Sequence, residues 1–244
     1  MDHYGLIGHP VAHSFSQRYF SEKFERESIR ARYDLFDLPD VAALPALIAD
    51  RPELRGLNVT VPHKQTVITH LDALDDTART VGAVNVISIR TGALTGHNTD
   101  VEGFRSMLAP LLNGERPRAL VLGSGGASRA VAFVLRTVGI KFRVVSRDRT
   151  RGDLTYDMVD PIVLKVCPLI INTTPVGQFP DVDAAPPLPY AALTPKHLLI
   201  DLVYNPERTL FLKRGTEHGA HTSNGLPMLH AQAEAAWRIW NYGS

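Results

Sequence analysis

The 244-residue chain contains a single cysteine, Cys167. A single thiol excludes a disulfide framework, so the fold must be stabilised by its core. Because Cys167 lies in the apolar stretch KVCPLIIN, we expect a buried core thiol. Such a thiol fits a reducing compartment, and we expect a cytoplasmic protein.

Long apolar runs and an excess of charge are also missing. No apolar run approaches the roughly 20 residues that span a bilayer, and the N-terminal MDHYGLIGHP has no basic region followed by an apolar one. We therefore expect neither a membrane anchor nor an export signal. The 26 Lys and Arg residues nearly balance the 25 Asp and Glu residues, so the chain lacks the positive field that nucleic-acid binding needs. We expect no nucleic-acid partner.

Histidines at a metal-binding spacing are the next absence. His9 and His13 stand four residues apart, but Pro10 lies between them and would break the helix that brings such a pair together. We expect no metal site.

The first hundred residues alternate short β-type runs with helical segments, which argues for a parallel sheet covered by helices. The expected strands are HYGLIG, ARYDLFD and GLNVT, and the expected helices lie near residues 15–27 and 41–49. NVISIR and ALTGHN then form a strand, turn and strand. Pro62 suits the first position of a short helix carrying Lys64, since its missing N–H is not needed there.

A second β-α series follows the helical stretch VEGFRSMLAPLL and the exposed connection NGERPR. RALVL, KFRVV, PLIIN and LLIDLV are the apolar strands of a buried parallel sheet. The length allows two domains. We predict two α/β domains, at residues 1–102 and 103–225, the second of them Rossmann-like and doubly wound, and a C-terminal helix at 226–244 that packs back on the first domain.

That last helix has one polar exception on its apolar side. Its apolar side carries Leu229, Gln232, Ala233, Ala236 and Trp240 at helical spacing. Gln232 is either an amide tolerated at the edge of the core or an amide aimed into a cleft, and the pattern favours neither.

The stretch ALVLGSGGASRAVAFVL reads as strand, glycine turn and helix. Gly123, Gly125 and Gly126 allow a tight turn and a close approach to a pyrophosphate at the helix N-terminus, although Ser128 occupies the third glycine position. A plain tight turn is the alternative. The strand before and the helix after favour dinucleotide binding.

The end of the next strand indicates which dinucleotide is bound. Ser146 stands where an NAD enzyme has an acidic residue, and Arg147, Arg149 and Arg151 follow it. Guanidinium groups suit a 2′-phosphate, which favours NADP. A solvated basic loop is the alternative, and Asp148 weakens its field.

Lys64, Asn85 and Asp100 each fall at or just beyond the C-terminal end of a predicted strand, where open α/β sheets place ligand contacts. Each alone has an ordinary explanation as a solvated charge or a turn former. Together with a nicotinamide site they suggest hydride transfer coupled to proton transfer.

The chain resembles the shikimate dehydrogenase family nearly from end to end. The matching motifs, in the family's order, are GHPVAHSFS, GLNVTVPHK, GAVN, GHNTD, GSGGASRA, INTTPVG, DLVYNP and NGLPMLHAQA. The resemblance implies an NADP-dependent oxidoreductase that reversibly reduces 3-dehydroshikimate to shikimate, on the route through chorismate to the aromatic amino acids. The small-molecule substrate would be the protein's main partner, and both a monomer and a homodimer remain open.

The resemblance also implies roles for particular residues. Lys64 and Asp100 match the catalytic pair. Ser14 and Ser16 would bind the substrate carboxylate. The residues matching other substrate contacts are Thr60, Asn85, Tyr204 and Gln232, with Lys64 and Asp100 also touching substrate. Those matching the cofactor site are Gly123, Ser124, Gly125, Gly126, Ala127, Ser146, Arg147, Arg149, Thr174, Leu202 and Gly225.

The chain departs from the family pattern at several points. Gln17, Val101 and Gln178 replace residues common in the family, and none of them is a proposed catalytic group. The stretch RDRTRGDLTYDMVDPIVLK is short of the helix that usually follows the second strand of the nucleotide domain, so we expect a more open adenine side.

Two other functions remain as alternatives. The first is an NAD-dependent quinate/shikimate dehydrogenase, and the second is a catalytically silent protein that binds the nucleotide without turnover.

Overall fold

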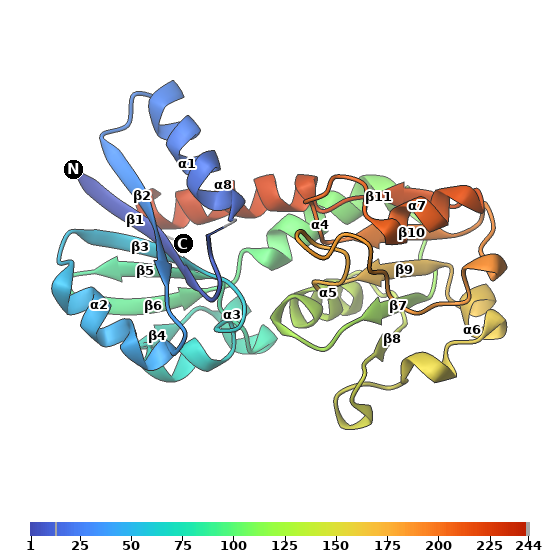
Figure 1. The fold of residues 1–244 in the computed structure, drawn as a ribbon. Coiled ribbons are helices and arrows are strands. Elements are labelled where there is room, and N and C mark those ends of the chain that lie inside the picture. The colour runs from blue at the N-terminus through green and yellow to red at the C-terminus, as the bar shows by residue number, and fades with distance from the viewer. Residues whose placement is uncertain (13, 243–244) are drawn as a thin grey trace. The chain divides into compact units, whose positions relative to one another are not determined.

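The computed structural model describes residues 1–12 and 14–242, and its chain divides into two compact units (Figure 1). Residues 1–102 and the end of the chain from Gln232 form the first unit, and Gly103–Ala231 form the second. His13 lies outside the described residues. No described helix is long and apolar enough to cross a membrane.

The first unit contains a six-stranded mixed sheet. Its strands are β1 (Asp2–Gly8), β2 (Ala31–Asp37), β3 (Leu54–Val59), β4 (Ala73–Leu74), β5 (Val86–Arg90) and β6 (Ala93–His97), in the order β2-β1-β3-β5-β6-β4. The predicted parallel arrangement holds for β1 with β2 and β3. The predicted strand, turn and strand is the antiparallel pair β5 and β6, and β5 also runs antiparallel to β3. The short strand β4 was not predicted.

Short helices connect these strands. They are α1 (Phe15–Arg26), the 3₁₀ helix η1 (Val41–Ala43), α2 (Leu44–Asp50), η2 (Thr66–His70) and α3 (Asp76–Val81). The predicted helix beginning at Pro62 is wrong, because residues 61–65 form turns and helical structure begins only at Thr66. The carbonyl of Lys64 accepts instead from the backbone N–H of Val84, which diverts it from a helical bond.

The helix α8 (Leu226–Tyr242) carries the last aromatic residues of the chain onto the first sheet. The ring of Trp240 stacks on Tyr4 at 4.8 Å, and its indole N–H donates to the carbonyl of Ile87 at 3.1 Å. Ala233 and Ala236 are buried beside it, as the helical spacing predicts. Gly56 is required on β3, because a Cβ atom there would lie 2.2 Å from the Trp240 ring nitrogen.

The second unit is a five-stranded parallel sheet with connecting helices. Its strands are β7 (Ala119–Leu122), β8 (Phe142–Val145), β9 (Leu169–Asn172), β10 (Leu198–Asp201) and β11 (His221–Ser223), in the order β11-β10-β9-β7-β8. Its helical segments are α4 (Asp100–Leu112), which begins in the first unit, α5 (Gly126–Thr137), η3 (Arg149–Arg151), η4 (Tyr156–Met158), α6 (Pro161–Val166), η5 (Tyr190–Ala192) and α7 (Leu210–Glu217). The four predicted strands are present, and β11 is an addition.

The connection between β8 and β9 is short of helix, as its sequence predicts. It holds two 3₁₀ turns and the six-residue α6. Cys167 follows α6 and is buried and unpaired, which confirms the predicted core thiol.

Candidate functional site

Three polar side chains meet at one edge of the first sheet. Lys64 lies five residues beyond the end of β3, and Asp100 follows β6 as the first residue of α4. The prediction that Asn85 ends a strand is wrong, since it immediately precedes β5. Because β5 runs antiparallel to both β3 and β6, its beginning lies at the edge where those strands end. The antiparallel pairing therefore brings all three residues to one edge.

Lys64 and Asp100 form a nearly enclosed ion pair. The Nζ of Lys64 lies 2.6 Å from Oδ2 of Asp100, and only 17% and 5% of their side chains are exposed. A charge-assisted bond of this length holds both groups in one orientation. The start of α4 also favours the carboxylate, because helix N-termini carry partial positive charge.

Asn85 occupies the second oxygen of the same carboxylate. Its Nδ2 donates to Oδ1 of Asp100 at 3.0 Å and lies 2.9 Å from Oγ1 of Thr99. Its Oδ1 accepts from the backbone N–H of Thr99 at 2.7 Å, which fixes the direction of the amide. Gln232, from α8, places Oε1 3.4 Å from the Asn85 Nδ2. The polar exception on the last helix therefore belongs to this cluster.

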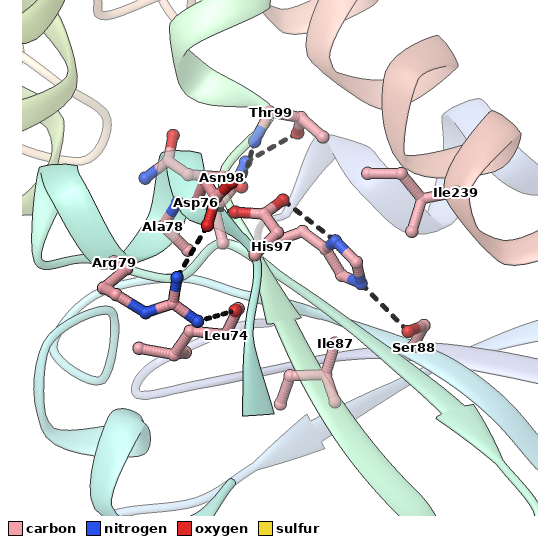
Figure 2. Close-up of polar contacts among 12 residues, drawn as sticks. Leu74, Asp76, Ala78, Arg79, Ile87, Ser88, His97, Asn98, Thr99 and Ile239 are labelled. Atoms are coloured by element: carbon pink, nitrogen blue, oxygen red, sulfur yellow. Dashed lines mark hydrogen bonds and ion pairs between the residues drawn. The ribbon is translucent and has the colours of Figure 1, made fainter. Parts of the chain in front are cut away.

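A buried chain of hydrogen bonds supports the loop that carries Asp100. Figure 2 shows His97 bonded to Ser88, at 2.9 Å, and its other ring nitrogen lies 3.0 Å from the carboxylate of Asp75. Asp75 also accepts from the N–H of Ala78, which caps α3. Although burial opposes it, these bonds keep the pKa of Asp75 below its usual value.

Ser88, His97 and Asp75 are residues of the types found in a hydrolytic triad, but they are not accessible to a substrate. Ser88 and His97 are 6% and 4% exposed, so a substrate could not reach the hydroxyl. We therefore interpret the hydrogen bonds among Ser88, His97 and Asp75 as structural support for the site. Sequence reasoning missed Thr99 and His97 as site-forming residues, although GHNTD, the motif that predicts Asp100, contains both.

The two predicted carboxylate-binding serines begin α1. Ser14 accepts from the backbone N–H of Ser16 at 3.2 Å and caps the helix. Ser16 hydrogen-bonds the buried hydroxyl of Tyr33, which donates to Oδ1 of Asn58 on β3 at 2.7 Å. Burial raises the pKa of Tyr33, so its hydroxyl stays a neutral donor.

Two other predicted substrate-contact residues, Thr60 and Tyr204, belong to different units. Thr60 follows β3 directly, and its N–H donates to the carbonyl of Ile7 at 2.9 Å. It packs against Gly8, where a Cβ atom would come within 2.3 Å of its methyl group. Thr60 therefore lies at the sheet edge that carries Lys64. Tyr204 follows β10 and belongs to the second unit.

The glycine turn joins β7 to α5 in the second unit. Gly123 has a φ of +109°, and a Cβ atom there would lie 2.8 Å from the Thr173 hydroxyl, so the position requires glycine. Gly125 precedes α5 without any side-chain cap, and a Cβ atom there would meet nothing within 4 Å. The start of α5 thus has no side-chain cap and has open space at Gly125, which fits a pyrophosphate at a helix N-terminus.

The remaining predicted cofactor residues lie at the same ends of their strands. Thr174 follows β9 and bonds Asn172 through its hydroxyl, at 2.6 Å. Leu202 follows β10, and its carbonyl would lie 2.2 Å from a Cβ atom on Gly225, beyond β11. Ser124, Gly126 and Ala127 belong to the glycine turn and the first turn of α5.

The arginine loop follows β8. Ser146 is buried, lies 3.3 Å from the hydroxyl of Ser124 and accepts from the N–H of Asp148. Hydrogen bonds from the hydroxyl and N–H of Thr150 lower the pKa of Asp148. Its carboxylate is thereby engaged locally. Arg147 and Arg149 are exposed beside it.

Comparisons with known proteins agree with this geometry. Residues 6–87 match the family model for the shikimate dehydrogenase substrate binding domain. The chain is 36% identical to the NADP⁺ shikimate dehydrogenase of Desulforamulus reducens, covering 97% of this chain and 88% of that protein. The corresponding Symbiobacterium thermophilum enzyme is 38% identical, with coverage of 97% and 87%.

A solved structure is similar over the same extent. The shikimate 5-dehydrogenase of Thermus thermophilus, in complex with NADP(H) and shikimate, has a TM-score of 0.85 and 36% identity, covering 99% of this chain and 94% of that chain. The similarity confirms the predicted two-sheet α/β fold class. With relatives of this identity over nearly its whole length, the chain belongs to the shikimate dehydrogenase family.

Proposed function

We propose that the protein is an NADP-dependent shikimate dehydrogenase, which reversibly reduces 3-dehydroshikimate to shikimate in the biosynthesis of chorismate and the aromatic amino acids. The observation that carries the proposal is the 2.6 Å contact between Lys64 and Asp100. Lys64 lies within residues 6–87, which match the substrate binding domain, and Asp100 follows that region. Relatives named as NADP⁺ enzymes support the choice of cofactor.

In this proposal Lys64 carries the proton. NADPH, when bound, supplies the hydride that reaches C3 of the substrate. The ammonium of Lys64 stabilises the negative charge that develops on the C3 oxygen and donates a proton to it, which leaves a neutral amine. In the opposite direction the amine accepts the hydroxyl proton. The exposed 17% of the Lys64 side chain gives water access to restore its charge.

Asp100 would orient the lysine rather than take the proton itself. One of its oxygens accepts from Lys64 and the other from Asn85, so the carboxylate is held on both sides. Its negative charge attracts the Lys64 ammonium and holds it in one position. The pair is thus prepared for proton transfer before substrate arrives.

The substrate's polar groups would be bound by the side chains that match the family's substrate contacts. We assign the substrate carboxylate to the hydroxyls of Ser14 and Ser16, and the ring hydroxyls to the residues predicted from the family motifs, which are Thr60, Asn85, Tyr204 and Gln232. The mutual contact of Asn85 and Gln232 supports this assignment for two of them.

The second unit would hold the cofactor. We assign the pyrophosphate to the glycine turn and the first turn of α5, and the 2′-phosphate to Arg147 and Arg149 beside Ser146. The open space above Gly125 and the lack of an acidic side chain at position 146 support the assignment. On these grounds we assign residues 1–102 and the chain from residue 226 onward to the substrate domain, and residues 103–225 to the NADP domain. The buried, unpaired Cys167 supports a cytoplasmic location.

A single spectrophotometric experiment tests the function. The purified protein is assayed at the nicotinamide band with shikimate or quinate, each with NADP⁺ or NAD⁺. We expect kcat/KM for shikimate with NADP⁺ to exceed the other three combinations at least about tenfold, the difference that 1.4 kcal/mol of transition-state binding gives. Preference for quinate with NAD⁺ would support the catabolic alternative. Dinucleotide binding without any turnover would support the catalytically silent alternative.

A further inference from the structure

The short connection between β8 and β9 leaves a pocket of about 460 Å³ on the second unit. Its lining comes from the beginnings of β7 and β8, from Leu154 and from α6 with the residue that follows it. In the register of these strands, Leu120 lies opposite Arg143, and the N–H of Ala119 donates to the carbonyl of Lys141. The pocket therefore opens on one face of the edge pair β7 and β8.

The pocket has an apolar floor and an apolar wall. Leu120 and Cys167 lie at the bottom, at 0% and 6% exposure. Ile162 and Val166, one turn apart on α6, form the wall and are 70% and 46% exposed. Two large aliphatic side chains exposed on the same face of a six-residue helix, beside a concave surface, are typical of a binding site.

Every charged side chain that lines the pocket is basic. These side chains are Arg118, Lys141 and Arg143, and within the described residues no Asp or Glu belongs to the lining. Arg143 lies 3.6 Å from Asp153, which compensates part of its charge, so the positive charge of the rim comes chiefly from Arg118 and Lys141. The rim thus favours an anion beside the apolar floor.

This charge pattern selects among possible occupants. A second copy docked with this pocket on the two-fold axis would bring the basic side chains against identical ones, which is unfavourable. The volume falls within the range of small-molecule sites, roughly 300–1,000 Å³. We propose that the pocket binds a small amphipathic anion, a carboxylate or sulfonate on an aromatic or short acyl frame, with its apolar part against Leu120 and Val166 and its charge near Arg118 and Lys141.

The pocket lies away from the glycine turn. Arg118 and Lys141 precede β7 and β8, whereas Gly123 and Ser146 follow the other ends of these parallel strands. Four strand residues span about 13 Å at roughly 3.3 Å per residue. The protein should therefore bind the anion and a dinucleotide at the same time, at separate sites. The proposal does not depend on the protein's catalytic function.

The test uses 8-anilinonaphthalene-1-sulfonate, which has an aromatic frame and one sulfonate. The full-length protein is titrated with the probe while NADP⁺ is kept saturating, so that binding at a dinucleotide site does not contribute. We expect fluorescence to rise with a stoichiometry of one, and octanoate to displace the probe. Val166→Glu and Lys141→Glu should each weaken binding at least about tenfold, since each replaces a favourable contact with a negative charge.

Matched variants elsewhere on the same unit serve as controls. Leu111→Glu changes an exposed aliphatic residue on α4, and Lys196→Glu changes an exposed lysine; neither residue lines the pocket. Both should bind the probe as the unmodified protein does. Thermal unfolding of each variant confirms that it is folded.

The lone cysteine provides a second readout. Because Cys167 lines the pocket and the chain has no other thiol, a bound anion should slow its alkylation by N-ethylmaleimide at least about threefold. An absence of probe binding, equal binding by the pocket and control variants, or an unchanged alkylation rate would each overturn the proposal. A change of oligomeric state in the pocket variants would also overturn it, by identifying the occupant as a second copy.

Discussion

Asn85 donates to the one carboxylate oxygen of Asp100 that Lys64 leaves open, so a single carboxylate is bonded by an ammonium on one side and an amide on the other. The amide is itself fixed by the backbone N–H of Thr99. Four residues that are far apart in the chain, counting Gln232, thereby form one cluster. The geometry of Asp100 is set before any ligand binds.

Replacing Lys64 by alanine should remove the proton donor. We expect kcat for shikimate oxidation to fall on the order of a hundredfold or more, with little change in KM, because the proton moves chiefly in the transition state. Steady-state kinetics with NADP⁺ measure this, and Lys165→Ala, an exposed lysine on α6, is the control. Turnover near the unmodified rate would contradict the role given to Lys64.

Replacing Asn85 by alanine should affect both stability and turnover. The buried N–H of Thr99 would lose its acceptor, which costs about 1–3 kcal/mol of unfolding free energy. Asp100 would keep its bond to Lys64 but lose its second donor, so its carboxylate would be held less firmly and kcat should fall. Denaturant unfolding and steady-state kinetics check the two effects. A lower stability with an unchanged kcat would limit Asn85 to a structural role.

The sequence predicts the local elements of the molecule better than their pairing. Continuous apolar runs identify the strands of the second sheet, because strands of a parallel sheet are buried on both faces. The antiparallel place of β5 depends on pairing with β3, some thirty residues earlier, and no local pattern specifies it. Asn85 was therefore placed at the wrong end of a strand. The helix expected after Pro62 failed for a similar reason, since a long-range bond from Val84 uses the Lys64 carbonyl.

The chemistry of the site was predictable to a different degree. Lys64 and Asp100 stand out because their family motifs identify them, and their 2.6 Å contact agrees with the predicted pair. The pattern of the last helix left Gln232 undecided between a core edge and a cleft. Its position 3.4 Å from the Asn85 amide places it in the polar cluster around Asp100. The support that His97 gives to the site could not be predicted, because its burial and its contacts with Ser88 and Asp75 depend on the tertiary structure.

Arg147→Ala together with Arg149→Ala should weaken binding of NADP⁺ more than binding of NAD⁺. Both guanidinium groups are exposed after β8, where the 2′-phosphate of the proposed cofactor would lie. We expect KM for NADP⁺ to rise at least about tenfold, as charge-assisted bonds to an anion contribute roughly 1.5–3 kcal/mol, while KM for NAD⁺ stays constant. Arg105→Ala, an exposed arginine on α4, is the control. Equal changes for both cofactors would argue against recognition of the 2′-phosphate.

Gly56→Ala should destabilise the first unit through its contact with α8. The added methyl group would lie 2.2 Å from the Trp240 ring nitrogen, and that ring is fixed by its bond to Ile87. Overpacking of this kind costs about 1–3 kcal/mol. The variant Trp240→Leu should also be destabilised, but the double variant should be more stable than the sum of the two effects predicts. Additive losses in chemical unfolding would show that the two residues do not interact.

Asp201, at the end of β10, should make stability depend on pH in the direction opposite to most carboxylates. Burial raises its pKa from 3.8 to about 6, although Thr209, Val203 and Asn172 donate to it. Between about pH 4 and 6 the folded protein therefore binds more protons than the unfolded chain, so the Asp201 contribution to the free energy of unfolding falls as pH rises. The loss approaches about 3 kcal/mol above pH 6, from a shift of 6 − 3.8 = 2.2 at 1.36 kcal/mol each.

Asp201→Asn isolates this contribution, because the amide stays neutral and can still accept from Val203 and donate to the Thr209 hydroxyl. We expect the unfolding free energy of the variant, relative to the unmodified protein, to increase from pH 4 to pH 6.5. Asp157→Asn is the control. The Thr155 hydroxyl lowers the pKa of Asp157, so the contribution of Asp157 to the pH dependence of stability lies below the interval from pH 4 to pH 6.5. A relative stability of Asp201→Asn that stays constant or decreases with pH would show that Asp201 is already ionised in the folded protein at pH 4. In that event its three donors outweigh the burial of its charge.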